Sequence, residues 1–468
     1  MIRKKRTAHQ TSIWIATQDL QVKPMITFYT KLNSVLNKME FGNQVRKLCE
    51  DYYSSKTNCR PPIDPEIYFK MLMIGFFENI GSERAIASRC ADSISIREFM
   101  GYTLIESTPD HSTLSVIRKR LPVGIYSQVF SIVLKELQKN GLVKGKNLAL
   151  DTSVMEANAS LSGLTNRMTE ESYAKYIADL AKQSGVDPED KAAVARFDRK
   201  REGRKTSNDE WFNPHNKDAK IGKTKNGGTD MLNKPENTVD LDTGAVINAD
   251  VLLGDVADTK ELSERIVNAQ LRLIDISDNP LELEPMETLT TDKGYFNVQE
   301  IIEIQSYNII PVIPDKEIKR NLDKLSDEEI AAVELTRSTV TSQEGKELLK
   351  RRGMHVERSF AHILDCGGQR RTTLNGIEEV RKRYLIAAAS YNLSLLMRKL
   401  FGIGTPKQWF AKVNLAFNLI FQALISVIKQ FFANYRIQLN FSLSNCYFVA
   451  LSSQFSMICK FYSFSTGS

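Results

Sequence analysis

Three acidic residues stand where they could do chemistry: Asp151, Asp292 and Glu357. Asp151 follows the apolar residues 148–150 and Asp292 closes the stretch TLTTD, so both end predicted strands, where α/β sheets place ligand-facing groups. Glu357 lies in a predicted helix. Converging carboxylates repel one another unless a cation is present, and hard oxygen ligands suit Mg²⁺ or Mn²⁺. Two such ions could clamp the attacking and leaving oxygens of a phosphodiester displacement. With 56 acidic residues in the chain, this pattern alone does not establish a site.

Alternating strands and helices would position these acids. We expect a β-hairpin over residues 237–253 and buried strands at 286–292 and 308–314. A helix over 297–307 has Asn297 at its N-cap and Glu300 at N3. The pattern predicts an α/β layer.

The Glu357 helix is expected to span residues 341–368. Thr341 and Glu344 form a plausible capping box, and two glycines end the segment. Gly353 and Ala361 flank Glu357 at minus four and plus four, which leaves open space around the acid. A mid-helix glycine costs up to ~1 kcal/mol, so either a close approach justifies Gly353 or it is merely tolerated.

The region before the first strand, residues 23–140, is predicted to be helical. Its last helix places Leu114, Ile117 and Leu121 on one face, with Arg118 and Lys119 off that face. Short helices ending in a basic one are typical of a helix-turn-helix arrangement. An ordinary helical domain with a solvated basic face explains the pattern equally well.

Two further segments stand apart from the α/β pattern. Residues 196–225 contain 10 Lys/Arg against 5 Asp/Glu, which fits either a flexible basic loop on phosphates or a solvated surface loop. The tail from Phe401 onward has five Lys/Arg and no acid. Its apolar part, 413–432, nearly reaches bilayer length, but it holds two Asn, two Gln and a Lys, so we expect a helix packed on the body.

Composition bounds the class of protein. The 468 residues are 42% hydrophobic and 25% charged, which indicates a globular chain of two or three domains. A net charge of +7 is compatible with a polyanionic partner or with a basic soluble protein. The six cysteines show no CxxC pattern and the N-terminus lacks an apolar signal region, so we expect reduced thiols and a cytoplasmic protein.

Taken together, LALDTSVMEANA, TTDKGYFN and HVERSFAHILDCGG resemble the DDE motifs of bacterial insertion-sequence transposases. The segment IDPEIYFKMLMIGFFENIGSERAIASRC resembles the N-terminal domain that often precedes them. The resemblance covers residues 23 to about 405. It implies an RNase H-like fold with Asp151 on the first strand, Asp292 on the fourth and Glu357 on the following helix. The hairpin would supply strands two and three, and 308–314 strand five.

The resemblance also implies a function. The family performs metal-dependent DNA strand cleavage and strand transfer at terminal inverted repeats, which implies two Mg²⁺ or Mn²⁺ ions held by the three acids. DNA is the implied partner, in a homodimer or larger synaptic complex, and no membrane is expected. Beside the acids, four basic residues could contact phosphates or could be solvated charges: Lys293, Arg358, Arg370 and Arg371. Arg118 and Lys119 are the corresponding candidates in the helical region.

These inferences give a division of the chain. A basic arm covers residues 1–22, a helical DNA-end-binding domain 23–140, and a catalytic α/β domain 141–400 with a basic insertion at about 160–235. A mostly helical apolar extension follows at 401–468. One departure from the family lies before strand two, where Pro235 cannot donate to a sheet ladder. We therefore expect that strand to start later or to be distorted.

Two other functions remain open from the sequence. The chain could be a catalytically inactive or domesticated DNA-binding protein derived from a transposase. It could also be a nuclease on the same scaffold that cuts RNA or branched DNA. The presence of all three acids favours the enzyme.

Overall fold

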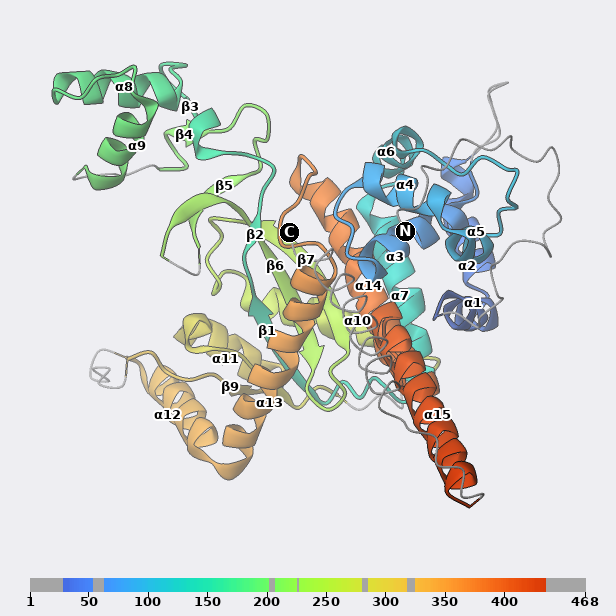
Figure 1. The fold of residues 1–468 in the computed structure, drawn as a ribbon. Helices are drawn as coiled ribbons and strands as arrows, with labels where there is room; N and C mark the ends of the chain where they lie inside the picture. Colours follow the sequence, from blue (N-terminus) through green and yellow to red (C-terminus); the bar gives the residue numbers. More distant parts are fainter. Residues whose placement is uncertain are drawn as a thin grey trace. The chain divides into compact units, whose positions relative to one another are not determined.

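The computed structural model describes residues 28–53, 63–201, 207–224, 227–279, 285–317 and 325–434. The chain divides into two compact units, Met1–Pro406 and Lys407–Ser468. The predicted arm at 1–22 lies outside the described residues. Figure 1 shows the first unit as a mixed sheet with helices around it.

A mixed β-sheet forms the centre of the first unit. Its middle strand, β1 (Asn147–Thr152), runs antiparallel to β6 (Thr229–Asp240) and parallel to β8 (Thr288–Thr290). Outside these lie β7 (Val246–Leu253), antiparallel to β6, and β9 (Ile310–Val312), parallel to β8. The order is therefore β7-β6-β1-β8-β9, with the hairpin and the last strand where the sequence predicted them.

The departure at Pro235 has a different outcome from the one expected. Strand β6 begins at Thr229, before the proline, and passes through it. The Pro235 carbonyl accepts a hydrogen bond from the Ser153 backbone N–H at 2.8 Å, in the break between β1 and β2 (Met155–Glu156). Because the ladder is interrupted there, the missing N–H leaves no partner unsatisfied. The predicted late start was wrong, and the irregularity in pairing with β7 falls at Thr238 and Val239 instead.

Helices cover both faces of the sheet. On one face lie α13 (Gln343–Phe360) and α14 (Ile377–Phe401), which both reach the buried Asn237 of β6: Ser359 Oγ lies 3.0 Å from its Nδ2, and Tyr384 donates to its Oδ1 at 2.9 Å. On the other face, α10 (Leu262–Ile276) pairs Arg265 with Glu236. The neighbouring residues Glu236 and Asn237 of β6 thus point to opposite helix layers.

The helix that carries Glu357 differs from the predicted one. A separate helix, α12 (Asp327–Thr341), ends where the capping box was expected, and Ser342 caps α13 by accepting from the Gly345 N–H at 2.9 Å. The segment Ala361–Cys366 continues α13 as a π-helix. A Cβ added at Gly353 would meet nothing within 4 Å, so no close approach requires that glycine. The predicted cap of α11 (Val298–Ser306) by Asn297 is confirmed.

The N-terminal region is helical, as predicted. Its helices are α1 (Phe28–Lys38), α2 (Phe41–Cys49), α3 (Pro65–Phe77), α4 (Glu83–Asp92), α5 (Ile94–Met100), α6 (His111–Arg120) and α7 (Val123–Lys139), with a short turn at Glu50–Tyr52. Helices α3 and α7 pack against α14 of the sheet layer. A shared core therefore joins the helical region to the sheet, and the predicted domain boundary at 140 stays a prediction.

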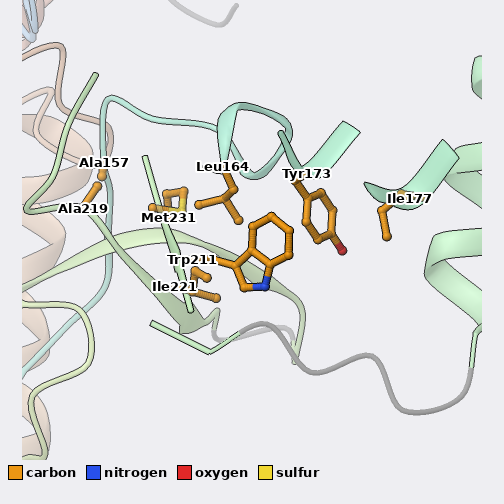
Figure 2. Packing of buried hydrophobic residues seen from close by; sticks show 8 residues of the cluster. All are labelled: Ala157, Leu164, Tyr173, Ile177, Trp211, Ala219, Ile221 and Met231. Carbon is orange, nitrogen blue, oxygen red and sulfur yellow. The ribbon is translucent and has the colours of Figure 1, made fainter. Parts of the chain in front are cut away.

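The described residues of the segment 157–231, between β2 and the first residues of β6, form what we call the insertion lobe. It contains a short turn at Leu161–Gly163, β3 (Thr165–Asn166), α8 (Tyr173–Gln183), α9 (Lys191–Lys200), β4 (Trp211–Phe212) and β5 (Lys220–Lys223). Figure 2 shows the small core built around Trp211. The sequence predicts a basic insertion over about residues 160–235 that includes a flexible or solvated loop at 196–225. A second helix and a core of its own were not foreseen.

The second unit is described through α15 (Pro406–Asn434). Large apolar side chains are exposed on it, among them Phe410 and Ile420. Among the described residues, none of the helices combines the length and apolar character needed to cross a bilayer. The expected packing of this helix on the body stays a prediction.

Candidate active site

Two of the three predicted acids meet at one edge of the sheet. In the parallel pairing of β1 with β8, Ala149 lies opposite Thr290. Asp151 and Asp292 each lie two residues farther on, so the same register carries both carboxylates to the same end and the same face. Burial raises the pKa of Asp151 to about 6, the Arg352 guanidinium lowers it, and the neighbouring Asp292 carboxylate raises it. The Asp292 carboxylate is thus close enough to act on the pKa of Asp151.

Arg352 of α13 neutralises this edge. One of its terminal nitrogens lies 2.6 Å from Asp151 Oδ2, and the Thr152 backbone N–H donates to Asp151 Oδ1 at 2.8 Å. Only about a fifth of either side chain in the ion pair is exposed. Arg352 was not among the site residues predicted from the sequence. Its position five residues before Glu357 was visible, but which side of α13 faces the sheet was not.

Glu357 does not join the other two acids. Its side chain is exposed, while its neighbours Val356 and Ser359 are buried against the sheet. The five residues that separate it from Arg352 make about 1.4 helical turns, so the two side chains leave α13 on different sides. Within the described ranges, no group of three or more His, Cys, Asp and Glu side chains could hold a metal ion. The expected three-acid cluster is therefore not assembled, and the role of Glu357 stays a prediction.

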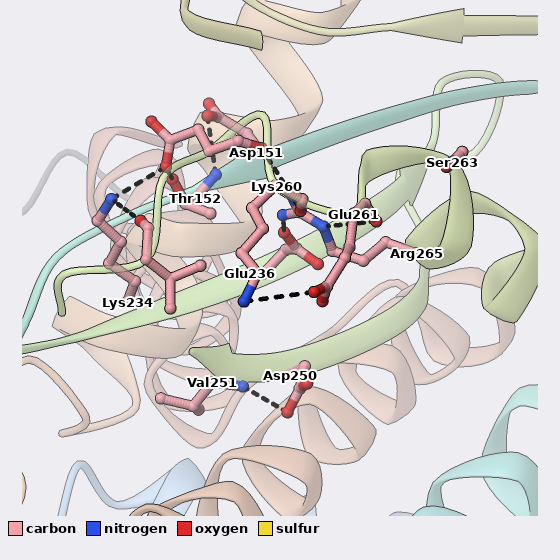
Figure 3. Close-up of polar contacts among 12 residues, drawn as sticks. Asp151, Thr152, Lys234, Glu236, Asp250, Val251, Lys260, Glu261, Ser263 and Arg265 are labelled. Carbon is pink, nitrogen blue, oxygen red and sulfur yellow. Dashed lines mark hydrogen bonds and ion pairs between the residues drawn. The ribbon is translucent and has the colours of Figure 1, made fainter. Parts of the chain in front are cut away.

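A second polar network supports the edge from the α10 face (Figure 3). Asp258 accepts hydrogen bonds from Thr152 Oγ1 and Lys234 Nζ, both at 3.1 Å. Arg265 bonds the Glu236 carboxylate and also the backbone oxygens of Asp258 and Lys260. The strand that carries Asp151 is thus tied to the loop before α10. No motif pointed to this network, because its members come from two strands, a loop and the helix α10.

Two residues of this layer have strongly altered acidity. Burial raises the pKa of Glu236 to about 7, although the Arg265 guanidinium lowers it. Tyr295, which follows Asp292 closely, is 1% exposed, and burial raises its pKa well above the ordinary value. An aromatic side chain beside the acids could pack in the core or stack on DNA. Its burial assigns it to packing.

The predicted DNA contacts fall into two groups. Lys293, Arg358 and Lys119 are exposed, and Arg371 is 74% exposed with Glu156 3.8 Å away. Two others already have partners. Arg370 bonds Asp365 and the Val154 carbonyl, and Arg118 is buried between Glu83 and Glu379.

The position of Arg118 corrects the expectation for α6. The helix was expected to present Arg118 off its apolar face, but α14 covers it from outside the helix and supplies Glu379. Arg118 therefore contributes to packing between helices. Lys119 remains the candidate for DNA contact on α6.

The two acids at the ends of adjacent strands suit the chemistry of a polynucleotidyl-transferase type of enzyme, and the family comparison suggests that class. The chain matches two family models, one described as "Transposase domain (DUF772)" over residues 19–120 and one as "Transposase DDE domain" over residues 200–393. No curated protein and no solved structure shows a significant match to it. The chain belongs to the DDE transposases of insertion sequences.

The two matches bear differently on the three acids. Asp292 and Glu357 lie inside the range that matches the DDE domain, and Asp151 lies before it. The assignment of Asp151 therefore depends on its resemblance to the first motif and on its place beside Asp292 in the sheet.

Proposed function

We propose that this transposase cleaves DNA strands at the ends of its element and joins them to target DNA. The observation that carries the proposal is the parallel register of β1 and β8, which brings Asp151 and Asp292 to one edge. The strand order β7-β6-β1-β8-β9, with only β6 antiparallel to its neighbours, supports an RNase H-like fold for the catalytic region.

The donor set at this edge fits a hard divalent cation in part. Asp151 and Asp292 supply carboxylate oxygens, the ligand type that Mg²⁺ and Mn²⁺ prefer. Glu357 is the proposed third ligand, and it would have to approach from the exposed side of α13. Bound ions would stabilise negative charge on the attacking and leaving oxygens of the phosphodiester.

The protein's own residues prepare this edge. With a pKa of about 6, Asp151 is ionised at neutral pH and available as a ligand. Arg352 offsets the repulsion between Asp151 and Asp292 while no cation is bound. On the opposite face, Asp258 and Arg265 fix the end of β1, so Asp151 is held by both layers.

The remaining parts complete the proposal. The helical region, residues 23–140, would recognise the terminal inverted repeats, and Lys119, Lys293, Arg358 and Arg371 would contact phosphates. Two DNA ends must be joined, so the protein would act as a homodimer or larger synaptic complex, in the cytoplasm.

The direct test is Mg²⁺-dependent nicking and joining of DNA that carries the element's ends, with Asp292→Asn beside wild type. We expect cutting and joining by wild type, no cutting by the variant, and equal binding by both. If both bind and neither cuts, the chain is a DNA-binding derivative without catalysis. Cutting without joining, or a preference for RNA, would replace the proposal with a nuclease.

A further inference from the structure

We propose that the insertion lobe is a second DNA-binding element, which grips the sugar–phosphate backbone of duplex DNA through the basic outer face of α9. The inference rests on the proposed function, because it takes the DNA bound at the catalytic edge as its ligand. It adds a surface that lies outside the helical region expected to bind the transposon ends.

The lobe is a separately packed element. Trp211 is 5% exposed and meets Tyr173 edge to face, with ring centroids 5.2 Å apart, and Leu164 and Ile177 are buried in the same cluster (Figure 2). Helix α9 packs on α8 and contributes no fully buried residue. The hairpin of α8 and α9 therefore adds little to the core of the sheet.

The outer face of α9 carries a cluster of positive charge with little acidic pairing among the described residues. Arg196, Arg199 and Lys200 are exposed, and Arg196 forms a long ion pair with Asp190, at 4.0 Å. Asp198, the acid within the helix, is engaged elsewhere: it accepts from Tyr173 Oη at 3.1 Å and from Arg201 Nε at 2.8 Å.

This arrangement costs helix stability. Arg196 and Lys200 are four residues apart and Arg196 and Arg199 three apart, so their side chains are neighbours on one surface of α9. Like charges at this spacing destabilise a helix. A bound polyanion would offset the repulsion between these side chains by attracting each of them. Duplex DNA is the polyanion on which this enzyme family acts.

The lobe is rooted near the catalytic edge. Its chain leaves the sheet where Ala157 N–H bonds the Met231 carbonyl, on the same strand whose Asn237 pairs with Asp151. Six residues of strand separate Asn237 from Met231, a span of about 20 Å. One turn of duplex DNA is about 34 Å. DNA whose phosphate lies at Asp151 would therefore reach the lobe within one turn.

The test compares two triple variants in full-length protein. The lobe variant is Arg196→Gln, Arg199→Gln, Lys200→Gln. The control, Lys144→Gln, Lys346→Gln, Lys350→Gln, removes three exposed charges that lie outside both the helical region and the lobe. Both bind a duplex that carries the transposon end at several salt concentrations, and Trp fluorescence together with circular dichroism verifies that the lobe stays folded.

Each phosphate contact contributes about 0.9 to the slope of log K against log salt. We expect the lobe variant to lose about 2 to 3 from that slope and the control less than 1. Equal slopes for wild type and both variants would overturn the proposal, as would a change in oligomeric state with the slope unchanged. If wild type fails to bind the duplex at all, the proposed function itself fails.

Discussion

The central sheet and the insertion lobe use charge in opposite ways. At the sheet edge, Asp151 lies on a paired strand and two networks hold it, so its position is fixed before any ligand binds. Asp292 lies two residues beyond β8 and accepts from the Gly294 N–H at 2.7 Å. In the lobe, Arg199 and Lys200 are exposed on a helix supported by one small core. The proposed phosphodiester reaction requires groups held in fixed positions in a low-dielectric environment. The proposed contact with the DNA sugar–phosphate backbone requires charges that the DNA can reach.

The sharpest way to separate the two regions is Asp151→Asn. We expect cleavage to fall about 10³-fold or more, because several kcal/mol of charge stabilisation by bound metal would be lost at about 1.4 kcal/mol per factor of ten. Duplex affinity should stay within about threefold of wild type, whereas the lobe triple variant should lose affinity and keep single-turnover cleavage at saturation. Cleavage by Asp151→Asn at the wild-type rate would remove Asp151 from the site.

Trp211→Ala tests whether the lobe folds as its own unit. Removing a buried Trp costs about 3–5 kcal/mol, and the loss should be confined to the lobe. Hydrogen exchange should show lost protection in α8 and α9 with β1 and β8 unchanged. The matched variant, Leu150→Ala in the sheet, should instead destabilise the whole first unit. Loss of protection across the sheet in Trp211→Ala would contradict a separate lobe.

Glu236→Gln tests the buried network behind the sheet through pH. The folded pKa of about 7 exceeds the ordinary 4.5, so between these values the native state binds more protons than the unfolded state. Stability of wild type should therefore fall as pH rises from about 4.5 to 7 and level off above.

The glutamine variant lacks this proton linkage. The free energy of unfolding of the variant minus that of wild type should therefore increase by roughly 1–3 kcal/mol between pH 5 and pH 8. Urea unfolding at the two pH values measures the difference. An equal decline in both proteins would show that Glu236 is ionised throughout.

The smallest expected effect is that of Arg352→Gln. Removing a positive charge 2.6 Å from Asp151 should strengthen binding of a divalent cation by about three- to tenfold, or about 1 kcal/mol. Mn²⁺ titration followed by electron paramagnetic resonance at pH 8 measures this without DNA. Weaker Mn²⁺ binding would mean that Arg352 holds Asp151 in the geometry that binds metal, and Lys350→Gln on the same helix serves as control.

Much of the fold could be predicted from local sequence. Apolar runs that end in Asp151 and Asp292 gave the two central strands, and Asn297 marked the start of α11 because capping depends on a few adjacent residues. The cap of α13 was placed one residue too early, at Thr341, because Ser342 offers the same chemistry. The second lobe helix was missed, since its core joins Trp211 to distant residues.

The sequence by itself determined which acids end strands, because hydrophobic patterning and strand termination are local properties. The pairing that makes the two strands neighbours belongs to the tertiary structure. Only the tertiary structure decided which charges are available. Arg118 looks exposed on its own helix and is buried because α14 brings Glu379 over it, whereas Arg352 reaches Asp151 because α13 packs with that side toward the sheet. Burial and pairing depend on which elements meet, and that depends on the whole chain.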